Sequence, residues 1–329
     1  MKTIFCLIFS ISWGILLLGQ FDSHADGHEP GELEKVTLLL EWFPNADHVP
    51  LYVAQENNLF AKHGLAVELH WAGDPDAPLK LVAAGKYPFA VNYQQSVTIA
   101  RATEEGALPV KSIGVLVEHP LNTITFLKKS GIQTPADFKG KKIGYTVAPL
   151  DVLLFNAIAG AAGLTEDDYE LINVGANIIA PLLTGAIDAV IGPFRNYEIN
   201  ELKLEGAAAG YFPLEEHGIP DYYELVIISN DAFLQENPMT AKKLMLAIRE
   251  AIQFTKANPD EALKLYFQAN PDVRKELDEL AFRDTLELFA TTQVQSAEKW
   301  AAFVKFAHEK GLISKTVATE ELFVNVLEE

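Results

Sequence analysis

One cysteine occurs in the 329 residues, Cys6, and it lies in an apolar stretch at the start of the chain. That stretch follows Lys2, runs from Ile4 to Leu18 and leads to small residues ending at Ala25. The pattern predicts a secretory signal peptide over residues 1–25, since the run is shorter than the roughly 20 residues that span a membrane. After cleavage behind Ala25 the mature protein would have no cysteine, which excludes disulfides, thiolate catalysis and cysteine-ligated metals.

Positive charge is also scarce. The chain has 26 Lys and Arg against 45 Asp and Glu, a formal net charge of −19 at pH 7. This charge disfavours nucleic acid, anionic membrane surfaces and phosphorylated ligands as partners, and it favours solubility. We expect a soluble monomer in a periplasm.

The short motifs of common enzyme classes are missing. The sequence has no G-x-S-x-G, no H-E-x-x-H and no G-x-x-x-x-G-K-[ST]. Its histidines are scattered without the spacing of metal ligands. We therefore predict a protein that is not an enzyme, with no catalytic residue, no metal site and no cofactor.

Strand-like and helix-like segments alternate through the first two thirds of the chain. Apolar strands are expected at 35–41, 67–71 and 89–92, with helical patterns between them, which predicts an α/β fold with mainly parallel sheets. From residue 239 onward the pattern is almost wholly helical, so these helices must pack on an earlier sheet. We predict a first lobe from residues 33–118 plus 225–329 and a second lobe from residues 119–224.

Two segments share one plan. Residues 82–97 and 182–199 each contain a helix, a glycine stop, a short apolar strand and then Asn-Tyr followed by Gln94 or Glu198. In open α/β sheets, ligands bind outside the carboxyl ends of the strands. Two strand ends that are followed by similar polar and aromatic residues therefore predict one cleft, with one wall from each lobe.

Four strand ends carry the candidate ligand-binding residues. Aromatic faces and directional hydrogen-bonding groups gather there, and such a set suits a planar heteroaromatic solute. A buried Glu198 could accept from an exocyclic amine and a protonated ring nitrogen. The candidates are Trp42, Asn45, His48, Asn92, Tyr93, Gln94, Tyr145, Phe194, Asn196, Tyr197, Glu198 and, as a hinge or cleft residue, Tyr223.

Several of these residues have a plainer interpretation. Trp42 could be a core aromatic at a strand end, and Asn45 and Asp47 suit a helix N-cap as well as a ligand. His48 could donate a hydrogen bond at a helix start, and Glu198 could be a solvated helix residue.

The segments EWFPNADHVPLYVAQENNLF, FAVNYQQSV, GKKIGYTVAP and IGPFRNYE resemble bacterial periplasmic proteins that bind formylaminopyrimidine precursors of thiamine. These proteins are relatives of the fungal thiamine-pyrimidine synthases. The resemblance implies a type II periplasmic-binding fold with a two-strand hinge, and delivery to the permease of an ABC transporter. It places Trp42, Asn45 and His48 on one wall and Asn196 and Glu198 on the other.

The same resemblance supplies the enzyme alternative. The fungal synthases consume their own histidine, bind pyridoxal phosphate through a glycine-lysine loop and carry a C-C-C-F-C run for iron. Aligned here, the histidine falls at Ser96, the cysteine run at residues 219–223, and the loop after Tyr145 has no lysine. All three chemical elements are missing, which favours binding over synthesis.

Other relatives on this fold bind riboflavin, taurine or aliphatic sulfonates. A sulfonate site would favour cationic or hydroxyl donors, whereas this chain places amides and aromatics at its strand ends. Riboflavin stays open as an alternative, because its ring also stacks and accepts amide hydrogen bonds.

Overall fold

The structure is a computed structural model that describes residues 32–103 and 106–327. The predicted signal peptide lies outside the described residues. None of the helices described is long and apolar enough to cross a membrane.

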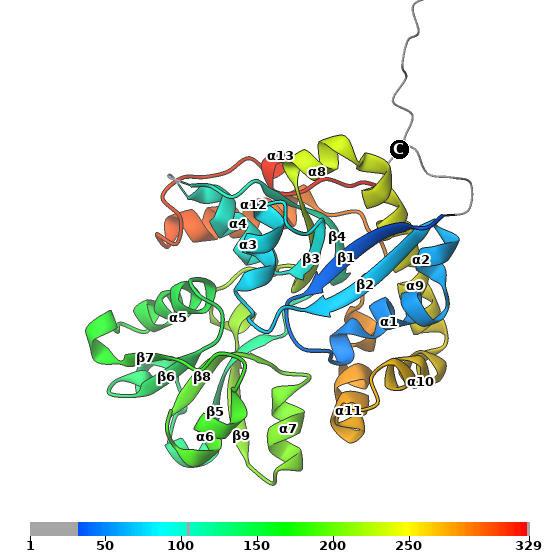
Figure 1. Cartoon of the computed structure of the whole chain (residues 1–329). Helices are drawn as coiled ribbons and strands as arrows, with labels where there is room; N and C mark the ends of the chain where they lie inside the picture. The colour runs from blue at the N-terminus through cyan, green and yellow to red at the C-terminus, as the bar shows by residue number, and fades with distance from the viewer. Residues whose placement is uncertain (1–31, 104–105, 328–329) are drawn as a thin grey trace, which may run out of the picture. The chain divides into compact units, whose positions relative to one another are not determined.

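Two five-stranded sheets form the framework (Figure 1). The first has the order β2-β1-β3-β10-β4, and β10 is antiparallel to both of its neighbours, β3 and β4. Its strands are β1 (Glu34–Leu40), β2 (Leu65–Trp71), β3 (Phe89–Asn92), β4 (Val110–Val117) and β10 (Leu225–Asn230).

The second sheet repeats this plan with the order β7-β6-β8-β5-β9, in which β5 is antiparallel to β8 and β9. Its strands are β5 (Asn122–Leu127), β6 (Lys142–Tyr145), β7 (Glu170–Asn173), β8 (Ala189–Phe194) and β9 (Ala209–Pro213). The strands of the two similar sequence segments, β3 and β8, are the middle strands of their sheets. The predicted α/β fold with two lobes and mixed, mainly parallel sheets is confirmed.

Helices cover the sheets, and the C-terminal ones return to the first. The long amphipathic α9 packs on α1 and α2 and contacts β2 and β4, while α12 contacts α4. Both ends of the described chain therefore pack on the first sheet. The helices are α1 (Val49–Glu56), α2 (Leu59–Lys62), α3 (Ala77–Ala83), α4 (Gln94–Ala102), α5 (Leu150–Ala161), α6 (Ile179–Thr184), α7 (Glu198–Leu204), α8 (Asp231–Glu236), α9 (Pro238–Ala257), α10 (Pro259–Ala269), α11 (Lys275–Thr285), α12 (Ala297–Glu309) and α13 (Thr319–Leu322).

The chain crosses between the two sheets after β4 and again before β10. Buried Glu224 joins these crossings, because its Oε2 accepts from the backbone N–H groups of Leu121 and, at 2.9 Å, of Asn122. Burial raises the pKa of Glu224 to about 8. Contacts unite Leu33–Glu329 into one compact unit, so the lobe limits at residues 118/119 and 224/225 stay predictions.

Candidate ligand-binding cleft

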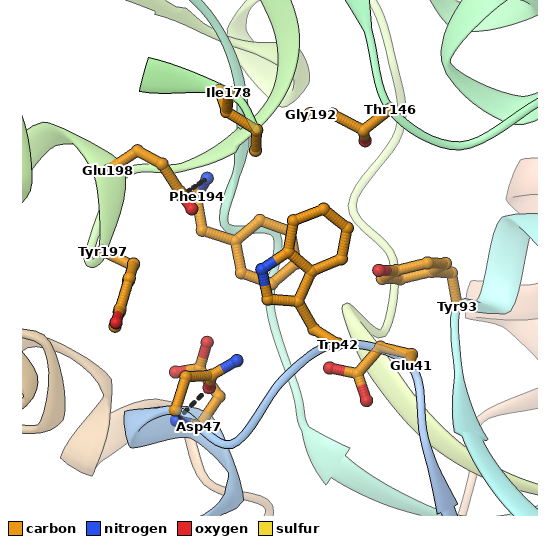
Figure 2. A pocket seen from close by; sticks show the side chains of 11 residues that line it. Glu41, Trp42, Asp47, Tyr93, Thr146, Ile178, Gly192, Phe194, Tyr197 and Glu198 are labelled. Atoms are coloured by element: carbon orange, nitrogen blue, oxygen red, sulfur yellow. Dashed lines mark hydrogen bonds between the residues drawn. The ribbon is translucent and has the colours of Figure 1, made fainter. Parts of the chain in front are cut away.

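A small cavity lies between the two sheets, where strands from both lobes end (Figure 2). Parallel strands that end at one edge of a sheet present their following residues together. The lining comes mainly from the segments after β1, β3 and β6 and around the end of β8: Glu41, Trp42, Asn45, Asp47, Tyr93, Thr146, Ile178, Gly192, Phe194, Tyr197 and Glu198. Six of the predicted residues are brought together here, namely Trp42, Asn45, Tyr93, Phe194, Tyr197 and Glu198.

Trp42 occupies the centre of this group (Figure 2). Although it follows β1 of the first lobe, it packs with the apolar cluster of the second lobe that includes Ile178, Leu182 and Val190. Its ring centroid lies 5.7 Å from that of Phe43 and 6.0 Å from that of Trp71. Trp42 is therefore both a buried packing residue and an aromatic face of the cavity.

The cavity has a volume of about 30 Å³. This is room for roughly two water molecules. A pyrimidine ring requires more space than this, so binding must be accompanied by separation of the lobes or movement of the Trp42 indole.

Three carboxylates give the cavity its electrostatic character. Glu41, Asp47 and Glu198 line it, whereas none of the described lining residues is Lys, Arg or His. All three side chains are at least nine-tenths buried. An acidic lining without a cation favours ligands rich in hydrogen-bond donors or positive charge and opposes anions.

Glu198 is the first residue of α7, and its Oε2 accepts from the backbone N–H of Phe194 at 2.7 Å. Burial raises the pKa of its carboxyl to about 8 despite that hydrogen bond. Near neutral pH the group therefore carries a proton for much of the time. It can exchange that proton with a basic ring nitrogen, which a permanently charged carboxylate could not do.

Asp47 joins the two lobes. The Nδ2 of Asn196 donates to Asp47 Oδ1 at 2.7 Å and to Thr285 Oγ1 at 2.6 Å, while the Thr285 hydroxyl donates to the same Asp47 oxygen at 2.7 Å. Burial raises the pKa of Asp47 to about 6, although these hydrogen bonds oppose the shift. Asn196 comes from the second lobe and the other two residues from the first, so the triad bridges the cleft.

His48 lies behind the cavity wall. It is fully buried, and its Nε2 lies 2.9 Å and 3.0 Å from the two Glu41 oxygens. The backbone N–H of Asn45 donates to His48 Nδ1 at 3.3 Å, so in the neutral ring the proton sits on Nε2. With both ring nitrogens engaged, His48 orients the Glu41 carboxylate and does not itself line the cavity.

Asn45 combines two roles that the sequence left open. Its Oδ1 accepts from the backbone N–H of Asp47 at 2.9 Å, which is the N-cap of a short 3₁₀ helix at Ala46–His48. Its side chain also lines the cavity.

Gly192 lets β8 pass close to the loop after β6. Its φ is +118°, and a Cβ there would lie 2.6 Å from Thr146 Oγ1. Asp151 holds that threonine, since its Oδ2 accepts from the Thr146 hydroxyl at 2.8 Å and from the Thr146 N–H at 2.9 Å. Only glycine suits this combination of backbone conformation and space.

The remaining predicted residues lie elsewhere. Asn92 lines a second, neighbouring cavity, and Tyr145 is half-buried against the core. Gln94 accepts from the backbone N–H of Tyr223 at 2.8 Å, and the Tyr223 hydroxyl accepts from Ser296 N–H at 2.8 Å. The side chains of Gln94 and Tyr223 therefore hold the segment in which the chain crosses back to the first lobe.

The sequence prediction did not include five lining residues: Glu41, Asp47, Thr146, Ile178 and Gly192. Four of them lie within two residues of a predicted site residue, so extending each predicted segment by a residue or two would have included them. Ile178 precedes α6 and carried no signal that separates it from core aliphatic residues. No group of three His, Cys, Asp or Glu in the described ranges is arranged to hold a metal ion.

Known proteins are similar to this chain over most of its length. A Haemophilus influenzae protein with thiamine biosynthesis in its name is 37% identical over 298 residues, covering 89% of this chain and 92% of that protein. The formylaminopyrimidine-binding protein of Halalkalibacterium halodurans is 32% identical over 327 residues, covering 97% and 98%. The 4-amino-5-hydroxymethyl-2-methylpyrimidine phosphate synthase of Aspergillus parasiticus is 29% identical over 292 residues, covering 85% and 84%.

Solved structures share the fold at low sequence identity. The alkanesulfonate-binding protein SsuA of Xanthomonas axonopodis, bound to MOPS, matches with a TM-score of 0.70 and 16% identity, covering 90% of this chain and 100% of that one. This likeness confirms the predicted periplasmic-binding-protein architecture. The sequence profile of the family described as NMT1/THI5 like matches residues 45–262. The chain therefore belongs to the NMT1/THI5-like family.

Proposed function

We propose that this chain is the solute-binding component of an ABC importer and that it captures an aminopyrimidine precursor of thiamine. The relative named for formylaminopyrimidine binding supports this proposal over almost the full length of the chain. The aromatic cavity between the two lobes supports it independently.

The observation that carries the proposal is the acidic, aromatic lining of the cleft. An aminopyrimidine presents a flat ring for stacking, an exocyclic amine that donates, and ring nitrogens that accept a proton. Trp42, Tyr93 and Phe194 supply aromatic faces. Glu198 supplies a carboxyl group that accepts from the amine and can pass a proton to the ring, giving a charge-assisted pair.

Binding would proceed by hinge closure. The solute first contacts one wall of the open cleft, and the second wall then closes over it. In the closed arrangement the Asp47–Asn196–Thr285 triad holds the lobes together. Exclusion of water strengthens the contact with Glu198, because charge interactions gain energy in a medium of lower dielectric constant.

The lining argues against an anionic solute. A sulfonate or phosphate would meet the carboxylates of Glu41 and Asp47 without a compensating lysine or arginine among the described lining residues. Riboflavin is the alternative on this fold, and its three fused rings would require a larger displacement of the cavity walls than the single ring of an aminopyrimidine.

A synthase activity is the second candidate, because fungal relatives are named for it. The residues expected for that chemistry do not stand at the aligned positions: Ser96 replaces the consumed histidine, and residues 219–223 contain no cysteine. These departures favour a binding role.

The proposal includes export. The signal peptide predicted for residues 1–25 would deliver the protein to the periplasm, where the closed form would dock on the membrane permease. The solute-binding fold supports this location, since proteins of this architecture include periplasmic components of import systems.

Isothermal calorimetry tests the proposal. The purified protein is titrated with formylaminopyrimidine, 4-amino-5-hydroxymethyl-2-methylpyrimidine, thiamine, riboflavin and MOPS. We expect the aminopyrimidines to bind more tightly than riboflavin and MOPS. Preferential binding of MOPS or riboflavin would overturn the ligand assignment, and release of a pyrimidine product from the protein without added ligand would favour the synthase.

A further inference from the structure

A second cavity, of about 350 Å³, adjoins the first. It lies between α3 and α4 of the first lobe and the loop that leads into α5 of the second, and α4 contacts α5 directly. Its volume is within the range of small-molecule sites, roughly 300 to 1,000 Å³. The small acidic cavity thus has a much larger neighbour in the same cleft.

The two cavities share a wall. At the end of β3, Asn92 lines the large cavity and the next residue, Tyr93, lines the small one. After β6 the same alternation occurs, with Thr146 on the small cavity and Val147 on the large one. Consecutive residues of the same two loops therefore border both cavities, which places the cavities side by side.

The chemistry of the large cavity differs from that of the small one. Most of its lining is apolar, including Leu79, Ile99, Leu108 and Leu150. Its two charged residues, Asp76 and Lys80, are of opposite sign and offset one another. Such a lining favours an uncharged, largely apolar group and gives no preference for an ion.

Three uncharged polar side chains also line this space, those of Asn92, Ser96 and Thr103. Asn92 is 2% exposed, and its Oδ1 accepts from the Tyr93 N–H at 2.9 Å. Its Nδ2 makes no hydrogen bond within the part of the chain that the structure describes. An amide donor that faces a cavity can be paired there by water or by an acceptor on a ligand.

Residues of both lobes line the large cavity. Asp76 of the first lobe accepts from the backbone N–H of Ala148 of the second at 3.1 Å, at the lining of this cavity. Closure around a solute would therefore enclose both cavities in one step.

We infer that the solute has two parts: an aminopyrimidine ring held in the small acidic cavity, and an uncharged, mainly apolar substituent with a hydrogen-bond acceptor for Asn92, held in the large cavity. This inference rests on the proposed function and extends it from a ring to a substituted ring. The substituent adds affinity by burying apolar surface against α3 and α4 and by pairing the Asn92 amide.

The test compares two probes by calorimetry: 4-amino-5-hydroxymethyl-2-methylpyrimidine and its benzyl ether. The ether keeps the ring and the hydroxymethyl oxygen as an acceptor, and it replaces the hydroxyl proton by an apolar benzyl group. We expect the benzyl ether to bind at least about tenfold more tightly. Ala100→Phe, which fills the large cavity from α4, should bring the ratio of the two dissociation constants close to one. Ala301→Phe, on an exposed position of α12, is the matched control and should keep the wild-type ratio.

Equal or weaker binding of the benzyl ether to the wild-type protein would overturn the inference and leave the proposed function intact. An unchanged ratio in a folded Ala100→Phe or, if that variant does not fold, Ala100→Leu protein would also overturn it. Failure of both probes to bind would instead overturn the proposed function, and the inference with it.

Discussion

Asn196 of the second lobe donates to Asp47 of the first across 2.7 Å, and both are buried. Thr285 completes the contact from the end of α11. The contact joins a residue after β8 of the second sheet to residues that pack on the first. In the proposed hinge closure, this pair would mark the closed cleft.

Replacement of Asn196 by alanine should weaken closure. A hydrogen bond to a charged group contributes about 1.5–3 kcal/mol, so we expect ligand affinity to fall by roughly tenfold or more. Calorimetry measures the affinity, and small-angle scattering measures the compaction on ligand addition. Asn200→Ala is the matched control, since Asn200 also bridges the lobes through Asp284 at 2.8 Å but at an exposed position. Equal effects of the two variants would contradict a special role of the buried triad.

The Glu198→Gln variant should lose affinity and remain folded. Glutamine preserves the shape and can still accept from Phe194 N–H, but it cannot form a charge-assisted pair with a protonated ring. We expect a loss of about 1.5–3 kcal/mol in binding free energy. Calorimetry checks the affinity and a thermal melt checks the fold. Glu201→Gln, one turn along α7 and paired with Arg274 at 2.6 Å, should bind as wild type. Unchanged affinity in Glu198→Gln would remove this residue from the site.

Trp42→Ala should lose both affinity and a ligand-dependent change in tryptophan fluorescence. The indole lies in the centre of the cavity, so a bound ring must contact or displace it. Base-like stacking contributes about 1–3 kcal/mol. Trp300→Phe, in the core of the first lobe, should retain the fluorescence response. A Trp42→Ala protein that kept both properties would show that the ligand binds away from this residue.

The stability of the protein should fall as pH rises from about 5 to about 8. Burial raises the pKa values of Glu198 and Glu224 from 4.5 to about 8, so between these values the folded chain holds protons that the unfolded chain has released. For each such proton, the free energy of unfolding falls by up to about 1.4 kcal/mol for every unit by which the pH rises. Urea unfolding at several pH values measures the slope.

Glu224→Gln should flatten this slope, because the uncharged amide can still accept from the hinge N–H groups without a cost of ionisation. Glu216→Gln, at an exposed position, is the control and should keep the wild-type slope. A stability that rises with pH over this interval, or a Glu224→Gln slope equal to that of wild type, would contradict the assignment.

Much of the architecture follows from local patterns in the sequence. The repeated helix-glycine-strand plan of residues 82–97 and 182–199 identified β3 and β8, which are the central strands of the two sheets. The aromatic residues after these strands reached the cavity because carboxyl ends of parallel strands share one edge of a sheet.

Contacts between segments that are distant in the sequence could not be predicted from local patterns. Thr285 meets Asp47 from 238 positions away, and no pattern in α11 distinguishes it from other buried threonines. Histidine is a residue type that often binds ligands, but the pairing of His48 with Glu41 depends on the turn made by residues 45–48. The roles of Asn196 and His48 thus depend on tertiary geometry that local sequence does not contain.

A crystal structure of the purified protein with formylaminopyrimidine tests the proposed binding site directly. We expect the ring to lie against Trp42 in the cavity between the lobes, with its amino group within hydrogen-bonding distance of Glu198. Asn196 should still be hydrogen-bonded to Asp47. A ring bound outside this cavity, or one that turns its amino group away from Glu198, would contradict the proposed binding site.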